Sequence, residues 1–93
     1  MSGPVTRDSM IKEQQIVNCL IRNGFRIHHA TMVDHVLYFT YVKGNVRVRY
    51  SPLCRSGMFR VLAGPLWNNG TGYLVVSVSS LQAIIDCMVK HFN

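Results

Sequence analysis

Apolar residues recur at helical spacing near the N-terminus of the chain, and this periodicity predicts a first helix over residues 9–23. We expect Asp8 or Ser9 to cap it, because short polar side chains accept hydrogen bonds from the free amides of a first turn. Asn23 and Gly24 are a typical stop signal. Residues 1–8 contain turn formers and little apolar mass, so we expect a tail there. The apolar stripe of this helix consists of Met10, Ile16, Val17, Leu20 and Ile21.

The middle of the chain is rich in β-branched and aromatic residues that alternate with polar ones, a pattern typical of strands. Gly44-Asn45 is a two-residue hairpin signal, because both residue types tolerate the left-handed backbone that such a turn requires. Pro52 and Gly57 predict a loop over residues 51–57. The predicted strands cover residues 25–31, 35–43, 46–50, 58–63 and 73–78.

A second helix is predicted from Ser79 to about Phe92, because Ser79 and Gln82 have the spacing of a capping box. Cys19 and Cys87 lie near apolar helical positions, so we expect both thiols to be buried. The apolar stripe of this helix consists of Leu81, Ile84, Ile85, Met88 and Phe92. The order of elements predicts one small α+β domain over residues 9–93, with an α–β(4–5)–α architecture and both helices on one face of an antiparallel sheet.

The two-residue turn also predicts which side chains share a face of the sheet. It places Lys43 opposite Val46, and therefore Val42 opposite Arg47, Thr40 opposite Arg49 and Tyr38 opposite Ser51. On this register Arg47 and Arg49 lie beside Tyr38 on the solvent face of the sheet. The other face belongs to the core, for which we expect eight buried residues: Leu37, Phe39, Val48, Tyr50, Leu81, Ile84, Ile85 and Met88.

Charge changes this picture more than composition does. The 93 residues contain ten Lys and Arg against four Asp and Glu, a net charge of +6. Between Asp34 and Asp86 the sequence contains no acidic residue, whereas it contains Lys43, Arg47, Arg49, Arg55 and Arg60. Cations beside an aromatic ring are typical of surfaces that bind single-stranded nucleic acid, with Tyr38 as the stacking platform. Cations that protect a sheet edge, or that bind an acidic protein surface, produce the same pattern.

Two short patterns resemble a catalytic loop and a metal site, but each is weak evidence for that chemistry. Cys54 and Arg60 have the Cys-x5-Arg spacing of a cysteine phosphatase loop, but residues 58–63 are expected to form a strand where that loop requires a helix N-terminus. His28, His29 and His35 are close in sequence, but neighbouring residues of a strand point to opposite faces, and the spacing matches no common metal site. We therefore expect no metal, no cofactor and no enzymatic activity.

The remaining features concern location and partners. The chain shows no signal-peptide pattern and no apolar run long enough to span a membrane, and it has three cysteines, so we expect a cytoplasmic protein with reduced thiols. Trp67 lies next to a turn and is a candidate anchor in a protein interface.

Two functional hypotheses remain. The first is a non-enzymatic binding protein that docks on nucleic acid or a nucleoprotein complex through the basic sheet face. The second is a protein-binding inhibitor of a larger host complex, such as a phage-type anti-defence (anti-CRISPR-like) protein, which is suggested only by its small size and by the lack of internal chemistry.

Overall fold

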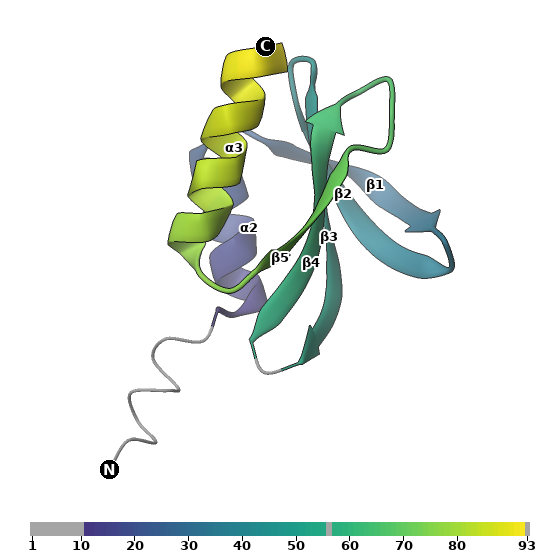
Figure 1. Cartoon of the computed structure of the whole chain (residues 1–93), viewed down its shortest axis with the longest axis vertical. Helices are drawn as coiled ribbons and strands as arrows, with labels where there is room; N and C mark the ends of the chain where they lie inside the picture. Colours follow the sequence, from purple (N-terminus) through teal and green to yellow (C-terminus); the bar gives the residue numbers. More distant parts are fainter. Residues whose placement is uncertain (1–10, 56, 93) are drawn as a thin grey trace.

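The computed structural model describes residues 11–55 and 57–92. The expected tail and the expected capping residues Asp8 and Ser9 lie outside the described residues. In chain order the elements are α2 (Glu13–Arg22), β1 (Arg26–Val33), β2 (Val36–Lys43), β3 (Val46–Arg55), β4 (Met58–Pro65), β5 (Thr71–Val75) and α3 (Val78–Phe92). They form one α+β unit in which both helices pack on the sheet, as predicted (Figure 1).

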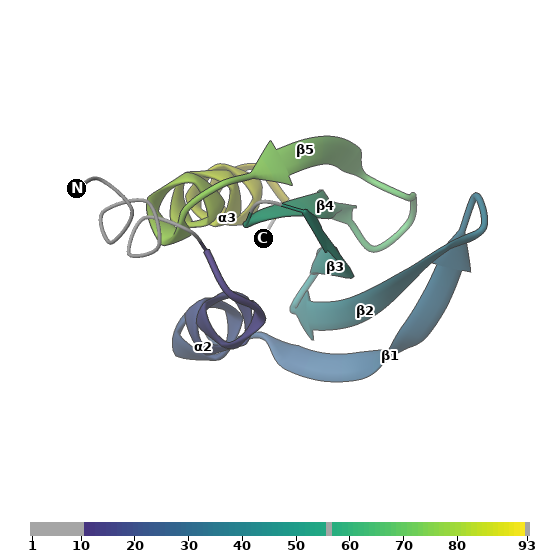
Figure 2. The same ribbon diagram turned by 90° about the horizontal axis from the view of Figure 1, so that it is seen from below.

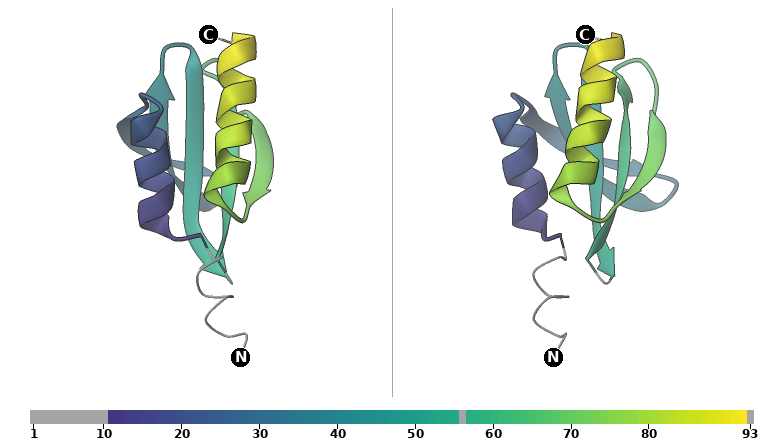
Figure 3. Two further views of the ribbon diagram at one scale, coloured as in Figure 1. Left: turned by 90° about the vertical axis from the view of Figure 1, so that its left-hand side faces the viewer. Right: turned by 60° about the vertical axis from the view of Figure 1, so that its left-hand side comes forward.

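The sheet is an antiparallel meander in which the strand order β1-β2-β3-β4-β5 follows the chain order. Figure 2 shows both helices on one side of it, with α3 alongside β4 and β5. The β1–β2 hairpin twists away from the helices, and Figure 3 shows that its far end passes behind the sheet, on the side opposite to α3. The sheet is therefore strongly curved, and only one of its faces is covered by helices.

The predicted register of the β2–β3 hairpin is confirmed. Lys43 pairs with Val46, and Thr40 pairs with Arg49, across a turn in which Gly44 has a φ of 56°. This left-handed φ is the conformation that glycine adopts at little cost. The turn therefore determines which side chains share a face from Phe39 to Tyr50.

The predicted loop over residues 51–57 and the predicted last strand both have wrong bounds. The loop expected over residues 51–57 is instead the end of β3, which reaches Arg55 and pairs it with Met58 after a register shift between Ser51 and Arg55. That irregularity spans Pro52, whose ring nitrogen has no hydrogen to donate to a sheet ladder. The last strand covers residues 71–75, earlier than the predicted 73–78.

Both helices begin at different residues from those predicted. Residues 11 and 12 are not helical, and α2 starts at Glu13, where the Lys12 amide donates to Gln15 Oε1 at 2.9 Å. The start of α3 is capped by Ser77 rather than Ser79: the Ser80 amide donates to Ser77 Oγ and the Ser77 amide donates to Ser80 Oγ, both at 3.2 Å. Because Ser77 caps α3, the preceding strand has to end earlier.

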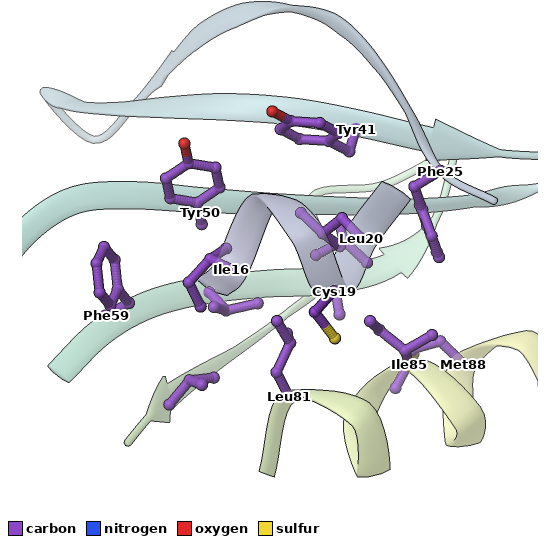
Figure 4. Packing of buried hydrophobic residues seen from close by; sticks show 14 of the residues in the cluster. Ile16, Cys19, Leu20, Phe25, Tyr41, Tyr50, Phe59, Leu81, Ile85 and Met88 are labelled. Carbon is purple, nitrogen blue, oxygen red and sulfur yellow. The ribbon is translucent and has the colours of Figure 1, made fainter. Parts of the chain in front are cut away.

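The core lies between the helices and the sheet (Figure 4). Its fully buried side chains include Ile16 and Leu20 of α2 and Leu81 and Ile85 of α3. Of the eight predicted core residues, five are buried, namely Val48, Tyr50, Leu81, Ile85 and Met88. Two others, Phe39 and Ile84, are partly buried against the core.

Three side chains that the apolar pattern assigned to the core are exposed, for two different reasons. Leu37 is 41% exposed because it pairs with Met32 near the end of the β1–β2 hairpin, beyond the reach of the helices. Ile21 and Cys87 are exposed on the outer sides of α2 and α3. Cys19 is buried as expected, and its burial raises the pKa of the thiol.

Candidate functional site

Four arginines lie on the face of the sheet opposite to the helices, which we call the helix-free face. Arg26 pairs with Val42, and Val42 pairs with Arg47, so these residues share this face. Arg49 and Arg60 follow by strand alternation, since Arg60 pairs with Ser51. The face comprises Arg26, His29 and Thr31 of β1, Tyr38, Thr40 and Val42 of β2, Arg47, Arg49 and Ser51 of β3, Arg60, Leu62 and Gly64 of β4, and Gly72 and Leu74 of β5.

The charge of this face is uncompensated along the strands. None of the five strands contains an Asp or a Glu, whereas six of their residues are Lys or Arg. Glu13 and Asp86 belong to the helices, and Asp34 lies in the β1–β2 turn. The helix-free face is therefore a local concentration of positive charge with one carboxylate at its rim.

Arg49 and Tyr38 are buried, and their predicted exposure on this face is wrong. Arg49 is 4% exposed and Tyr38 is 3% exposed. The alternation of the strand correctly predicts the face on which each side chain lies. It does not predict that the sheet curves strongly enough for the end of the β1–β2 hairpin to line one cleft with β4 and β5 on that face. Tyr38 consequently offers no open ring on which a nucleic-acid base can stack.

The buried guanidinium of Arg49 has few hydrogen-bond partners to compensate for its loss of solvent. Its Nη1 donates to Asn69 Oδ1 at 3.3 Å, and its buried Nε has no hydrogen-bond partner among the described residues. Burial lowers the pKa of Arg49, and the neighbouring Arg47 lowers it further. A buried cation next to a second cation is an unfavourable arrangement, because the desolvation cost is not offset by an opposite charge.

The turn between β4 and β5 forms hydrogen bonds with Arg47 and Arg49. Arg47 Nη2 donates to the carbonyl oxygen of Asn68, next to the Asn69 side chain that binds Arg49. Two glycines allow this turn to lie close to β4: a Cβ on Gly64 would lie 2.7 Å from Gly70 Cα, closer than two carbon atoms can approach. The turn therefore depends on the absence of side chains at these two positions.

A cleft of about 420 Å³ opens on the helix-free face between the end of the β1–β2 hairpin and strands β4 and β5. Tyr38 and Leu62 line it together with the exposed Arg60, and Asp34 lies at the hairpin end. Arg49 pairs directly with Leu62, so its side chain lies next to this lining. Asp34 also lines the cleft, so the lining combines one exposed cation, one exposed carboxylate, a phenol and apolar walls.

The other candidate residues lie elsewhere. Lys43 shares the opposite face with Val46, and its side chain passes close to Gly24, so it is separate from the four arginines. Arg55 belongs to β3 by its backbone, and its side chain lies outside the described part of the chain. Trp67 is 69% exposed, and its ring packs edge-on against Phe92 with 6.1 Å between the ring centroids.

The segment from Cys54 to Arg60 is a β-hairpin, because Cys54 belongs to β3 and Arg60 to β4. It therefore does not have the loop-then-helix geometry of a cysteine phosphatase. Among residues 11–55 and 57–92, no three His, Cys, Asp or Glu side chains lie together in a way that would hold a metal ion. No helix in that part of the chain is long and apolar enough to cross a membrane.

Comparisons of the chain with protein-family models, with curated proteins and with solved structures find no match.

Arg26 is the site residue that the sequence pattern missed. It lies on the helix-free face only because the β1–β2 ladder shifts register between Ile27 and His29. A bulge of this kind inverts the expected face of every residue on one side of it. The only available signal was the β-branched and aromatic character of the two strands, which predicts pairing but not register.

Proposed function

We propose that this protein is a small, non-catalytic binding protein that docks on nucleic acid or a nucleoprotein complex through the helix-free face. The observation that carries this proposal is the gathering of four arginines on one face of a sheet whose strands contain no acidic residue. Nucleic acid is a polyanion that such a surface can bind, because contacts between cations and phosphates supply most of the sequence-independent affinity of protein–nucleic acid complexes.

The exposure of each arginine defines its role in this proposal. Arg26 and Arg60 are exposed and Arg47 is half-buried, so these three side chains can reach phosphate oxygens. Arg49 is too deeply buried to touch a phosphate, and it contributes through the positive potential at the face. Because Tyr38 is covered, contacts are made to the backbone rather than to bases, and binding is insensitive to sequence.

The salt dependence of binding tests this proposal. Fluorescence anisotropy with labelled single-stranded and double-stranded DNA, measured at several salt concentrations, gives the slope of log affinity against log salt. Arg26→Gln and Arg60→Gln should each lower the magnitude of that slope by about 0.7–0.9, the value for one phosphate contact. Tyr38→Phe should leave the slope unchanged.

Lys90→Gln is the matched control, because Lys90 is an exposed cation on α3, which covers the other face of the sheet. It removes the same charge and should leave the slope nearly unchanged. Equal effects of Lys90→Gln and Arg60→Gln would show that only net charge matters. Absence of binding at low salt would reject nucleic acid as the partner.

The second candidate function is the protein-binding inhibitor. It is favoured by the exposure of several large apolar side chains, since contiguous exposed apolar surface is typical of protein interfaces. Those on the β1–β2 hairpin are Ile27, Met32 and Leu37, and the turn before β5 adds Trp67. Retention of these contacts at high salt would separate this function from phosphate binding, which weakens steeply with salt.

A further inference from the structure

The β1–β2 hairpin carries an exposed apolar surface on the face that it shares with the helices. Ile27 pairs with Tyr41, Ala30 with Phe39, and Met32 with Leu37, so apolar side chains occupy both strands of the hairpin on this face. Ile27 and Met32 are each 62% exposed. We call Ile27, Ala30, Met32 and Leu37 the β1 ribbon.

The β1 ribbon is continuous with the core. Phe39, which pairs with Ala30, is half-buried and packs against Tyr50 with 5.6 Å between the ring centroids. Tyr41 and Tyr50 are both buried. A partner that covers the ribbon would therefore extend the existing core instead of forming an isolated contact.

β1 is also an edge strand. It lies at the end of the five-stranded sheet and pairs with β2 along one side. The amides and carbonyls of its other side face outward, and such a row of backbone groups is a template for pairing with another strand. In the described part of the chain, no further strand occupies that edge.

The two faces of β1 differ in character. The face with Ile27, Ala30 and Met32 is apolar, whereas the opposite face carries Arg26 and His29. A strand added at this edge would therefore lie beside apolar side chains on one face and beside a cation on the other. Successive side chains of a strand point to opposite faces, so a segment in which apolar and acidic residues alternate would place its apolar side chains on the apolar face and its carboxylates on the face with the cation.

We propose that the free edge of β1 binds an extended segment of an acidic partner protein, in which apolar residues alternate with Asp or Glu. The segment would add a sixth strand to the sheet, with its apolar side chains against the β1 ribbon and its carboxylates toward Arg26. This is strand addition, in which backbone hydrogen bonds supply affinity and the flanking side chains supply specificity. The inference does not depend on nucleic-acid binding at the helix-free face.

The charge of the chain favours an acidic partner over a second copy. Two copies joined through β1 would bring their Arg26 and His29 side chains onto one shared face, and each copy carries a net charge of +6. Like charges on neighbouring strands are destabilising. A carboxylate at the same position would instead offset the positive charge of the strands.

Synthetic eight-residue peptides test this proposal on the full chain. The probe alternates valine with glutamate. One control alternates valine with lysine, and a second has four valines followed by four glutamates. In an NMR titration to millimolar peptide, only the probe should shift the β1 amide signals and slow their hydrogen exchange, because new hydrogen bonds protect amides. Equal binding of all three peptides, or of none, would reject the proposal.

Matched variants locate the binding edge. Ile27→Lys and Met32→Lys should each weaken binding of the probe about tenfold, because each places a cation in the apolar half of the interface. Leu74→Lys on the other edge strand, β5, is the control, since Leu74 is 65% exposed and Met32 is 62% exposed. Loss of binding in the Leu74 variant alone would place the site on β5 and contradict the proposal.

Analytical ultracentrifugation tests whether a second copy of the chain, and not an acidic segment, covers the β1 ribbon. The protein without peptide should sediment as a monomer at all concentrations used for the titration. A dimer that Met32→Lys dissociates would show that a second copy covers the β1 ribbon and would overturn the proposed partner. Arg60→Gln should leave peptide binding unchanged, which keeps this result separate from the test of the helix-free face.

Discussion

The side-chain amides of Asn23 and Gln82 bind each other reciprocally and join the end of α2 to α3. Asn23 Nδ2 donates to Gln82 Oε1 at 2.9 Å, and Gln82 Nε2 donates to Asn23 Oδ1 at 2.8 Å. Each amide has a further partner, since Asn23 Nδ2 also donates to the Cys19 carbonyl at 2.7 Å and Gln82 Nε2 to Asp86 Oδ1 at 2.9 Å. The pair therefore fixes both the helix–helix contact and the end of α2.

Removing either amide should destabilise the protein. Asn23→Ala and Gln82→Ala are each expected to lower the free energy of unfolding by about 1–3 kcal/mol, because the partner amide is left without its hydrogen bonds. The double variant should cost less than the sum, with a coupling of about 0.5–3 kcal/mol measured by urea denaturation. Strictly additive costs would show that the two amides do not stabilise each other.

Tyr50 should make stability depend on alkaline pH. Its hydroxyl donates to the Glu13 carboxylate at 2.9 Å, and burial together with that contact raises the pKa of Tyr50 above its ordinary value. The folded state thus holds the proton more tightly than the unfolded chain. This contribution is complete below the ordinary tyrosine pKa of about 10 and is lost as the pH rises above it.

The test is a series of urea denaturations between neutral pH and pH 11. Tyr50→Phe should reduce the alkaline fall in stability, and at neutral pH it should cost about 1–2 kcal/mol for the lost hydrogen bond. Glu13→Gln should reduce the alkaline fall partly, since it removes the negative charge and keeps the side-chain shape. An unchanged alkaline slope in Tyr50→Phe would contradict the prediction.

The position of the core can be tested by comparing alanine substitutions at two buried residues with the same substitutions at two exposed ones. Each pair consists of one leucine and one isoleucine. Leu81→Ala and Ile85→Ala should each cost about 2–5 kcal/mol, because both side chains are fully buried and leave a cavity. Leu37→Ala and Ile27→Ala should each cost about 1 kcal/mol or less, because these side chains lie at the surface. Equal costs at the two kinds of position would show that the β1 ribbon is covered in solution.

Arg49 should be replaceable without loss of stability. Its guanidinium is buried beside Arg47 and has an unpartnered Nε among the described residues, so the charge is a cost to folding. Arg49→Met keeps an unbranched stem of four heavy atoms and removes the charged end of the side chain, and we expect the free energy of unfolding to stay the same or rise. A loss of about 1 kcal/mol or more would show that the charge has a stabilising counterpart.

The absence of phosphatase chemistry also stays a prediction. A generic aryl phosphate should not be hydrolysed by the wild-type chain, because the Cys54–Arg60 segment is a hairpin and does not cradle a phosphate. Cys54→Ser should behave as the wild type in that assay. Turnover that disappears in Cys54→Ser would show that the non-enzymatic interpretation is wrong.

Local patterns were sufficient to predict the elements and part of the register. The Gly44-Asn45 turn determines the β2–β3 pairing, so the shared face of Arg47 and Arg49 could be derived without any long-range information. Helical periodicity likewise identified Leu81 and Ile85 as buried. In each case the determining residues are close to one another in sequence.

Curvature of the sheet could not be predicted in this way. Alternation assigns Tyr38 and Arg49 to a face, but their burial depends on the curvature of the whole sheet, which brings the end of the β1–β2 hairpin and strands β4 and β5 to one cleft on that face. The same twist carries Leu37 away from the helices and leaves it exposed. The bulge between Ile27 and His29 has no sequence signal that distinguishes it from regular pairing.

The meander has a consequence for the folding kinetics. Every strand pairs with its neighbour in sequence, so each pairing closes a short loop, and a low contact order of this kind is typical of fast folding. The contact between Asn23 and Gln82 joins α2 to α3 across 59 positions, a much longer loop than any pairing of neighbouring strands closes. Because loop-closure entropy grows with length, we expect the strands to assemble first and the helix–helix contact to form late in the folding reaction.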